Sequence, residues 1–348
     1  MRLGPADGSA MAAAAAQINA ASKPIVLLGL QTSQAELASG HQAFLQQSSI
    51  PYGATLQGSG RWVAPEHFVG RVGLFRNQPA DRLLDAADCV ITVGFDAIEY
   101  DPSLWNSGNQ RPLVAIDVEP VAQDQAFLPT AELIGDLQAT LAALGPHLNV
   151  SVDAAYRRSG DALAAELQAT AAEGAVIHEL QQVVTPETTI ALDVGSNYIW
   201  MNRYFPAAYA RQVLVSNGQQ TLGVALPWAM AAYLCRPGTP VISVSGDGGF
   251  LFTATELQTA TRIGSRFVHL IWNSGSYDMV AIQEQAHSGR TAGVELGTYD
   301  VVAFAETFGC KGYRISRADQ LGPVLIDIPI NYTQNQKLMQ DVHQDFLH

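Results

Sequence analysis

The sequence predicts an α/β protein with two doubly wound domains, each a parallel β-sheet with helices on both faces. Continuous runs of Val, Ile and Leu, typical of strands buried on both faces, alternate along the chain with helical segments. This pattern occurs twice, on either side of a linker-like stretch at residues 145–151. The 348 residues are enough for two domains of ordinary size, and we expect their bounds at 1–146 and 152–348.

The first domain opens with an Ala-rich helix at residues 10–21. Its strands are expected at 23–29, at 88–94, at 112–118 and at the start of 131–144, and its other helices at 33–48, at 80–87 and in the rest of 131–144. Asp117, near a strand end, could be an acidic ribose ligand. However, the first strand is followed by GLQTS instead of G-x-G-x-x-G, which disfavours a dinucleotide site.

The second domain opens with two helical stretches and continues with alternating strands and helices. The helices are expected at 153–170, 175–184, 221–234 and 253–264, and the strands at 188–195, 211–217, 239–249, 267–275 and 322–330. One connection is short, because SRADQL offers only about two helical turns where a parallel crossover needs about a dozen residues or more. We therefore expect that a segment on the order of ten to twenty residues is absent between Leu321 and Gly322.

Charge and hydropathy exclude some partners. The net charge is −13 and the chain has no basic block, so nucleic acid and anionic membranes are poor partners. No apolar run reaches membrane-spanning length, and the first residues lack a secretory signal pattern. We expect a cytoplasmic protein that binds neither nucleic acid nor membrane.

Two strand ends of the second domain carry residues suited to an anion. In DVGSN, Gly195 allows close backbone approach, while Ser196 and Asn197 offer donors at a helix start. In GDGGF, Gly248 and Gly249 let backbone N–H groups approach an anion. Ligands of open α/β sheets bind beyond the carboxyl ends of strands, which is where both stretches lie.

A metal ligand pattern follows from the next strand end. Asp247 of GDGGF is a hard oxygen ligand, and WNSGSYD supplies Asn273, Ser274, Ser276 and Tyr277. An Mg²⁺ ion between the two loops would suit these oxygens. Alternatively, G-D-G is common in turns, and Ser276 and Tyr277 could simply begin a helix. The 27-residue spacing from Asp247 to Ser274 makes the combination more specific.

GDGGF followed at this spacing by NSGSY resembles the signature of thiamine-diphosphate enzymes. The stretches SNGQQTLGVALPWAMAA, YDMVAIQE and GRVGLFRNQPADRLLDAAD resemble the catabolic, FAD-independent acetolactate synthases. This resemblance covers nearly the whole chain. It implies a central domain of nucleotide-binding shape without a cofactor, followed by a domain that binds thiamine diphosphate and Mg²⁺. It also implies condensation of two pyruvate molecules to 2-acetolactate and CO₂, a step toward acetoin, by a homo-oligomer that is a dimer or tetramer.

The resemblance also assigns metal ligands. They would be the side chains of Asp247 and Ser274 and the backbone carbonyl of Ser276. Ser274 stands where the family has Asp or Asn, and serine is a neutral and weaker ligand. Asn273 next to it could substitute.

Further roles come from the same resemblance. The backbone carbonyl of Gln220 would receive the pyrimidine amino group, and Leu222 would be the apolar wedge that bends the cofactor, where the family usually has Met. Gln283 would lie near the second substrate. Without the resemblance, Leu222 reads as helix packing and Gln283 as a solvated helix face. The residues expected to bind the cofactor are Gly195, Ser196, Asn197, Gln220, Leu222, Gly246, Gly248, Gly249, Tyr277 and Met279.

In the family, an N-terminal domain that binds the pyrimidine ring and carries a catalytic glutamate precedes these two domains, and this sequence is expected to lack it. The activity of the chain alone would then be incomplete. One alternative is a non-catalytic or split-enzyme subunit that needs a separate pyrimidine-binding chain. Another is a carboligase or decarboxylase that acts on a different 2-keto acid. A plain nucleotide-binding protein is disfavoured by the missing glycine pattern.

Overall fold

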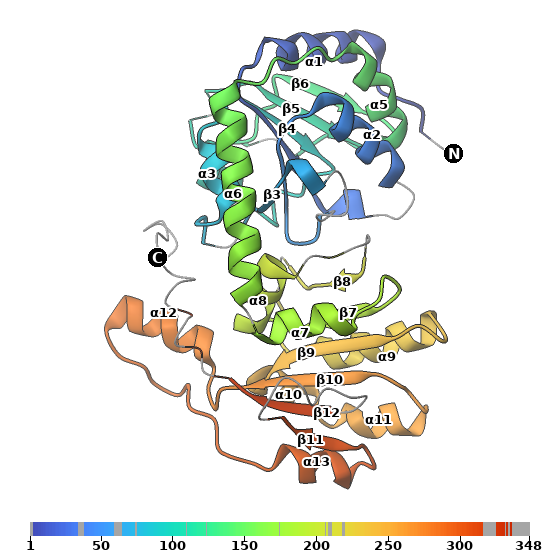
Figure 1. Cartoon of the computed structure of the whole chain (residues 1–348), viewed down its shortest axis with the longest axis vertical. Coiled ribbons are helices and arrows are strands. Elements are labelled where there is room, and N and C mark those ends of the chain that lie inside the picture. Colours follow the sequence, from blue (N-terminus) through green and yellow to red (C-terminus); the bar gives the residue numbers. More distant parts are fainter. Residues whose placement is uncertain are drawn as a thin grey trace. The chain divides into compact units, whose positions relative to one another are not determined.

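The computed structural model of the chain contains two compact units, which Figure 1 colours along the sequence. The first unit comprises residues 1–170 and 206–211, and the second comprises 171–205 and 212–348. The domain bounds expected from the sequence, 1–146 and 152–348, stay a prediction. The residues whose structure is described are 3–33, 38–58, 65–73, 75–108, 110–122, 124–173, 175–205, 207, 211–217, 220–315, 325–330, 332 and 335.

The first unit contains, among its described residues, a six-stranded parallel sheet in the order β3-β2-β1-β4-β5-β6. Its strands are β1 (Pro24–Leu28), β2 (Tyr52–Ala54), β3 (Phe68–Arg71), β4 (Cys89–Val93), β5 (Leu113–Asp117) and β6 (Ala131–Ile134). Its helices are α1 (Gly8–Ala20), α2 (Ala38–Ser48), α3 (Pro79–Asp85), α4 (Pro102–Asn106), α5 (Leu137–Leu144) and most of α6 (Ala154–Glu173), whose last residues belong to the second unit. Short 3₁₀ turns lie at Leu30–Ser33, Pro65–His67 and Gly145–His147.

Both faces of this first sheet are covered. Val26 and Leu28 of β1 pack in one apolar cluster with side chains from α1, α2 and α5. Ile25 and Leu27 pack in a second cluster with side chains from α3, α4 and α6. Successive strand residues point to opposite faces, so a strand that is buried on both sides needs a continuous apolar run. This explains why β1 could be predicted from its sequence alone.

The second unit repeats the architecture with a parallel sheet in the order β11-β12-β10-β9-β7-β8 among its described residues. Its strands are β7 (Thr189–Leu192), β8 (Val213–Leu214), β9 (Val241–Gly246), β10 (Val268–Asn273), β11 (Gly312–Arg314) and β12 (Leu325–Pro329). Its helices are α7 (Ala175–Val183), α8 (Ser196–Tyr204), α9 (Ala225–Cys235), α10 (Asp247–Thr253), α11 (Glu256–Arg262), α12 (Asp278–Ser288) and α13 (Val301–Thr307). The two parallel sheets confirm the predicted α/β fold class.

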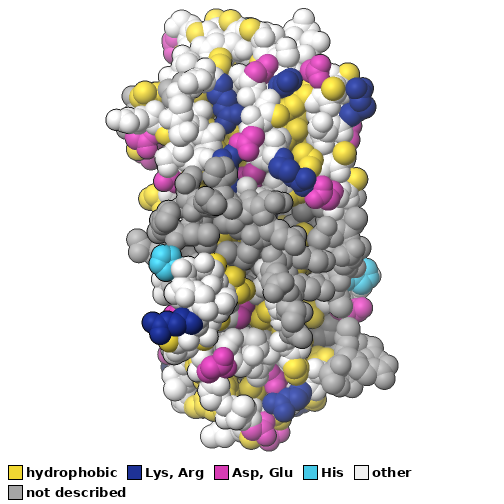
Figure 2. Space-filling model, turned by 90° about the vertical axis from the view of Figure 1, so that its left-hand side faces the viewer, with side chains coloured by type: hydrophobic (Ala, Val, Ile, Leu, Met, Phe, Trp, Pro, Cys, Tyr) yellow, Lys and Arg dark blue, Asp and Glu magenta, His cyan; other side chains and the backbone are white. Residues whose placement is uncertain are grey.

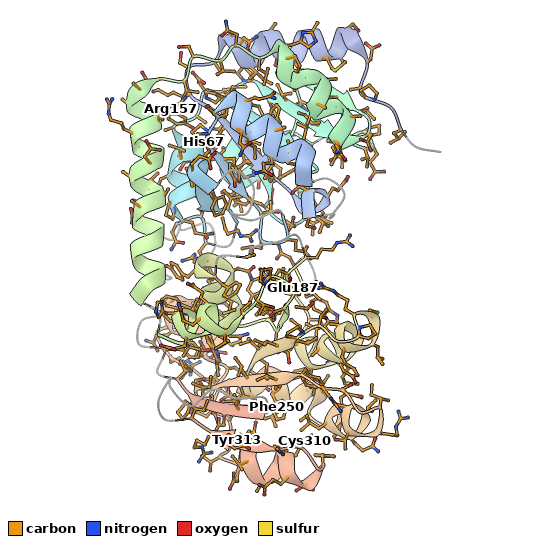
Figure 3. All side chains as sticks on the ribbon, turned by 45° about the vertical axis from the view of Figure 1, so that its right-hand side comes forward. His67, Arg157, Glu187, Phe250, Cys310 and Tyr313 are labelled. Carbon is orange, nitrogen blue, oxygen red and sulfur yellow. The ribbon has the colours of Figure 1, made fainter. Side chains whose placement is uncertain are left out.

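One apolar cluster of the second unit gathers residues from α9, α10, α11, β10 and α13. Phe250 of α10 lies within it, and Figure 3 shows this side chain inside the unit. The Phe250 ring also packs on the buried ring of His269, with 5.4 Å between the ring centroids. Because α10 is packed in this way, its first residue, Asp247, has a fixed position directly after the end of β9.

The sequence did not reveal every element. Strands β2 and β3 have three and four residues, which is too short to stand out as a buried run. The expected strand at 211–217 contains only the two-residue β8. Strands β11 and β12 pair in parallel, and the expected gap at Leu321–Gly322 between them lies outside the described residues.

On the face shown in Figure 2, acidic and basic side chains are interspersed on the described surface. The net charge of −13 therefore does not gather into one acidic patch on that part of the surface. Among the helices of the described residues, none is both long and apolar enough to cross a membrane.

Candidate functional site

The candidate residues of the second unit follow neighbouring strands. Strands β10, β9 and β7 are adjacent and parallel, so their carboxyl ends share one edge of the sheet. Gly246, the last residue of β9, pairs with Trp272 near the end of β10. The loop containing Gly195, the start of α10 at Asp247 and the loop containing Ser274 therefore meet at this edge.

The Asp247 carboxylate joins two of these segments. Its Oδ2 accepts a hydrogen bond of 2.6 Å from the backbone N–H of Gly275, and its Oδ1 accepts one of 3.0 Å from that of Gly248. The side chain is buried, and burial raises the pKa of Asp247, an effect that these N–H donors oppose. The 27-residue spacing seen in the sequence thus corresponds to a direct contact between the two loops.

Ser274 and Ser276 present two oxygens side by side. The Ser274 hydroxyl donates to the Ser276 backbone carbonyl across 3.1 Å. Two adjacent ligands of an octahedral Mg²⁺, each at about 2.1 Å, lie about 3 Å apart, so this pair has a suitable spacing. The neighbouring Asn273 instead donates from its side chain to Asp327 of β12, 2.9 Å away.

Among the described residues, no three His, Cys, Asp or Glu side chains gather in a way that could hold a metal ion. Within the predicted ligand set, a cation would therefore bind a single carboxylate, that of Asp247, and neutral oxygens from Ser274 and Ser276. Such a donor set of hard oxygens suits Mg²⁺, which also keeps waters and takes phosphate oxygens as ligands.

The start of α8 contains an acceptor without a partner. Gly195 has φ +139°, a conformation that favours glycine, and precedes Ser196 and Asn197 at the first turn of the helix. The Asn197 amide nitrogen donates to the backbone carbonyl of Asp193 at 3.0 Å. Its buried Oδ1 has no hydrogen-bond partner, and a Cβ at Gly195 would lie 2.9 Å from it. A buried acceptor left unpaired is costly, so this oxygen points to a missing donor or cation.

The two glycines that follow Asp247 in α10 have close neighbours, Tyr277 for Gly248 and Asp193 for Gly249. A Cβ at Gly248 would lie 2.4 Å from the Tyr277 ring, and one at Gly249 would lie 3.1 Å from the Asp193 carboxylate. Only glycine fits at Gly248 without displacing the ring. The two glycines allow the backbone to approach its neighbours closely, and their role in cofactor binding stays a prediction.

Asp193 is a residue that the sequence reasoning missed. Its carboxylate accepts hydrogen bonds from the backbone N–H of Gly223, at 2.9 and 3.0 Å to its two oxygens, and from that of Val194, at 2.8 Å. Burial raises the pKa of Asp193 to about 6, against the effect of these donors. The signal was present in the stretch DVGSN, as an acidic residue at the end of a buried strand.

The Asp193 contact brings in the segment that contains Gln220 and Leu222. Both residues precede Gly223, in the turn between β8 and α9. Gln220 is exposed and has φ +49°, and Leu222 is half-buried. Leu222, the residue expected to bend the cofactor, therefore directly precedes Gly223. The backbone N–H of Gly223 is hydrogen-bonded to Asp193, which follows the last residue of β7.

Asp278 and Asn335 were also missed. Asp278, the first residue of α12, is hydrogen-bonded through its carboxylate to the Ser196 hydroxyl. The Asn335 amide donates to both groups, at 2.8 Å each. Burial raises the pKa of Asp278, and the nearby Asp247 carboxylate adds to the effect. A second carboxylate thus lies at the same edge, although nothing local in YDMVAIQE distinguishes it.

Helix α12 contains the remaining candidates. Met279 is half-buried one residue after Asp278, and Gln283 is exposed further along the helix. The structure links neither side chain to the loops by a hydrogen bond among the described residues. Their roles stay predictions.

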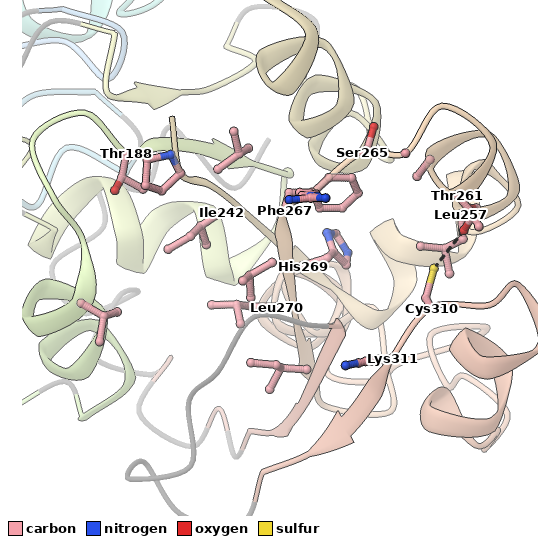
Figure 4. A pocket seen from close by; sticks show the side chains of 18 of the residues that line it. Thr188, Ile242, Leu257, Thr261, Ser265, Phe267, His269, Leu270, Cys310 and Lys311 are labelled. Carbon is pink, nitrogen blue, oxygen red and sulfur yellow. Dashed lines mark hydrogen bonds between the residues drawn. The ribbon is translucent and has the colours of Figure 1, made fainter. Parts of the chain in front are cut away.

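A cavity of about 890 Å³ lies elsewhere in the unit, at the amino ends of β9 and β10 (Figure 4). Its walls include Val241, Phe267 and Cys310, whose thiol is hydrogen-bonded to the Thr261 hydroxyl. None of the candidate residues is among its described lining. The chemistry expected from the sequence is therefore at the opposite end of these strands.

The described residues fit an anionic group bound with Mg²⁺. The fit rests on the unpartnered Asn197 oxygen, the spacing of the Ser274 and Ser276 oxygens, and the glycines beside Asp247. Asp247, Ser274 and Ser276 would hold the cation. The first turn of α8 would face the anion, because helix N-termini present free N–H groups.

Comparison with known proteins finds two thiamine pyrophosphate family models along the chain. Residues 11–144 match the thiamine pyrophosphate enzyme central domain, and residues 193–332 match the thiamine pyrophosphate enzyme C-terminal TPP binding domain. The two matches together cover most of the chain and fall within the two predicted domains.

Two curated relatives align with 98% of the chain. Acetolactate synthase of Bacillus subtilis (strain 168) is 40% identical over 367 residues, and catabolic acetolactate synthase of Raoultella terrigena is 39% identical over 370 residues. The chain spans 64% and 66% of their lengths. YdaP of B. subtilis, a putative thiamine pyrophosphate-containing protein, is 28% identical over 88% of the chain and 54% of its own length. The chain therefore belongs to the thiamine pyrophosphate enzymes and contains their central domain and their C-terminal, thiamine pyrophosphate-binding domain.

Proposed function

We propose that the chain holds the diphosphate and Mg²⁺ end of thiamine diphosphate in an acetolactate synthase, which condenses two pyruvate molecules to 2-acetolactate and CO₂. The observation that carries this proposal is the hydrogen bond from Gly275 to Asp247, because it joins the two loops that would grip the metal-bound diphosphate. The names of the two relatives at 39–40% identity support the choice of reaction.

The residues of the chain would act mainly by binding and orientation. Asp247 would neutralise the cation, with Ser274 and the Ser276 carbonyl as further ligands, and Ser196 and Asn197 would face the diphosphate. Leu222 would support the bent cofactor as an apolar contact, and the Gln220 carbonyl would accept from its amino group. Thiamine diphosphate supplies, when bound, an electron sink for the decarboxylation of a 2-keto acid. Gln283 would lie near the second pyruvate.

Calorimetric titration of thiamine diphosphate into the chain, with and without Mg²⁺, tests the binding site. We expect binding that depends on Mg²⁺ in the unmodified chain and is lost in Asp247→Ala. Glu187→Ala serves as the control, because it removes the same charge type from an exposed position of the same unit (Figure 3). Equal binding by Asp247→Ala and the unmodified chain would contradict the metal site.

The reaction has a separate test. Acetoin formed from pyruvate after acid treatment reports 2-acetolactate, and replacing pyruvate by other 2-keto acids distinguishes an acetolactate synthase from a related carboligase or decarboxylase. Cofactor binding without product would support the binding role and contradict synthase activity by this chain. Addition of a separate pyrimidine-binding chain would then restore turnover in a split enzyme.

The assembly and location of the protein are part of the same proposal. We propose a homo-oligomer, a dimer or tetramer, on the basis of the family resemblance, and a cytoplasmic location on the basis of the hydropathy of the sequence. Light scattering on the protein as it elutes from a sizing column measures the oligomeric state, and cell fractionation measures the location. A monomer that remains fully active would contradict the oligomer.

A further inference from the structure

The Asp193 carboxylate contacts three segments of the candidate site. It accepts from Val194 in its own loop and from Gly223 in the turn before α9. It also lies against Gly249 of α10, where an added Cβ would come within 3.1 Å of its carboxyl carbon. One buried side chain thus joins the ends of β7 and β9 to the turn that contains Leu222.

The turn is held from its other side as well. The Thr253 hydroxyl donates to the Gly223 carbonyl at 2.8 Å, so both peptide groups of Gly223 are fixed. Gly223 has φ +85°, and a Cβ there would lie 2.8 Å from that of Phe252. Asp193 and Thr253 together leave this residue, and with it the backbone of Leu222, little freedom.

Holding a turn with a buried charged group carries a free-energy penalty. Among the described residues, Asp193 has no ion-pair partner, and its stabilising contacts come from backbone N–H groups. Burying a carboxylate without a cation costs free energy that a neutral side chain would avoid. The two oxygens of a carboxylate, however, can together accept several N–H groups that converge on one side chain. A single neutral acceptor cannot do this. Positioning of the turn accounts for the use of a carboxylate here.

We propose that Asp193 is a positioning residue that fixes the Gly223–Ala225 turn and thereby holds Leu222 and Gln220 in place for the cofactor. The consequence for the cofactor rests on the proposed function, whereas the constraint on the turn does not. In this role Asp193 acts through the backbone of the turn and exchanges no proton or electron with a substrate.

Asp193→Asn tests this role, because the amide keeps the size of the carboxylate but turns an NH₂ group toward N–H donors. We expect hydrogen exchange of the Gly223–Ala225 amides in the cofactor-free protein to speed up about tenfold or more. The Kd for thiamine diphosphate at saturating Mg²⁺ should rise about tenfold, while the midpoint of global unfolding changes little. Thr253→Val, which removes the opposite hydrogen bond, should change exchange and Kd in the same direction.

Asp300→Asn is the matched control. Asp300 also binds backbone N–H groups, but those of Val302 and Ala303 at the start of α13 and not those of the Gly223–Ala225 turn. The Asp300→Asn variant should alter neither the hydrogen exchange of the Gly223–Ala225 amides nor the Kd for thiamine diphosphate.

The role of Asp193 is overturned if exchange at Gly223–Ala225 is unchanged in Asp193→Asn. It is also overturned if affinity falls only in proportion to global stability. A failure of the unmodified chain to bind thiamine diphosphate would instead contradict the proposed function. The two failures can therefore be told apart.

Discussion

The hydroxyl of Ser274 donates a hydrogen bond to the backbone carbonyl of Ser276, 3.1 Å away. Both oxygens are neutral, and they lie in the loop whose Gly275 N–H binds the Asp247 carboxylate. A divalent cation at this loop would meet only one negatively charged ligand of the predicted set, the Asp247 carboxylate. An acidic residue in place of Ser274 would supply a second negative charge. Since the affinity of oxygen sites for such cations depends on the charge of their ligands, this site should bind Mg²⁺ weakly without the diphosphate.

Ser274→Asp should strengthen the site. The added carboxylate would sit where the hydroxyl now lies beside the Ser276 carbonyl, and we expect the Kd for Mg²⁺ in the presence of thiamine diphosphate to fall about tenfold, equivalent to about 1.4 kcal/mol. Calorimetric titration of Mg²⁺ measures this change.

A control separates the local effect from that of net charge. Ser159→Asp makes the same change on the exposed side of α6, in the first unit. It should leave the Mg²⁺ affinity unchanged. Weaker binding by Ser274→Asp would show that Ser274 does not face the cation.

Gly248→Ala should disrupt the same corner for steric reasons. The new Cβ would lie 2.4 Å from the Tyr277 ring, so the ring or the backbone must move. We expect a loss of stability of roughly 1–3 kcal/mol, as for other overpacked sites, together with loss of cofactor binding. Urea unfolding and calorimetry measure the two effects.

Gly297→Ala is the matched control, because a Cβ there has no atom within 4 Å. Adding Tyr277→Leu to Gly248→Ala should recover part of the lost stability, since it removes the clashing ring. A Gly248→Ala variant with unchanged stability and cofactor binding would contradict the close contact between the two loops.

The sequence could predict the loops but not their supports. Asp247 and Ser274 follow buried strands with clear apolar runs, and adjacent parallel strands bring their ends together. Asp193 and Asp278 could not be found in this way, because their partners Gly223 and Ser196 lie 30 and 82 positions away along the chain. Local periodicity contains no information about such distant pairs.

His269 gives the second unit a pH response of a definite sign. Its ring is buried, and its nitrogens pair with the hydroxyls of Ser243, at 2.7 Å, and Ser245, at 3.0 Å. Burial lowers the pKa of His269 to about 3. The unfolded chain takes up a proton near the ordinary value of 6.5, so stability present above that pH is lost as the pH falls toward 3. Between pH 7 and pH 5 this loss is about 2 kcal/mol.

Asp193 acts in the opposite direction. Because its pKa is raised to about 6, its contribution is fully present below 3.8 and is lost as the pH rises through 6. Lowering the pH from 7 to 5 should therefore add about 1 kcal/mol from this group. The two residues partly offset each other in the unmodified chain.

Variants that no longer titrate should separate the two effects. Relative to the unmodified chain, His269→Gln should gain stability when the pH falls from 7 to 5, by about 2 kcal/mol, and Asp193→Asn should lose about 1 kcal/mol. Urea unfolding at both pH values measures these differences. The comparison is made within each variant, so any constant cost of the substitution cancels. If the stability of both variants relative to the unmodified chain changed in the same direction between pH 7 and pH 5, the opposite signs would be contradicted. If the stability of His269→Gln relative to the unmodified chain were the same at both pH values, this histidine would already be protonated in the folded protein at pH 5.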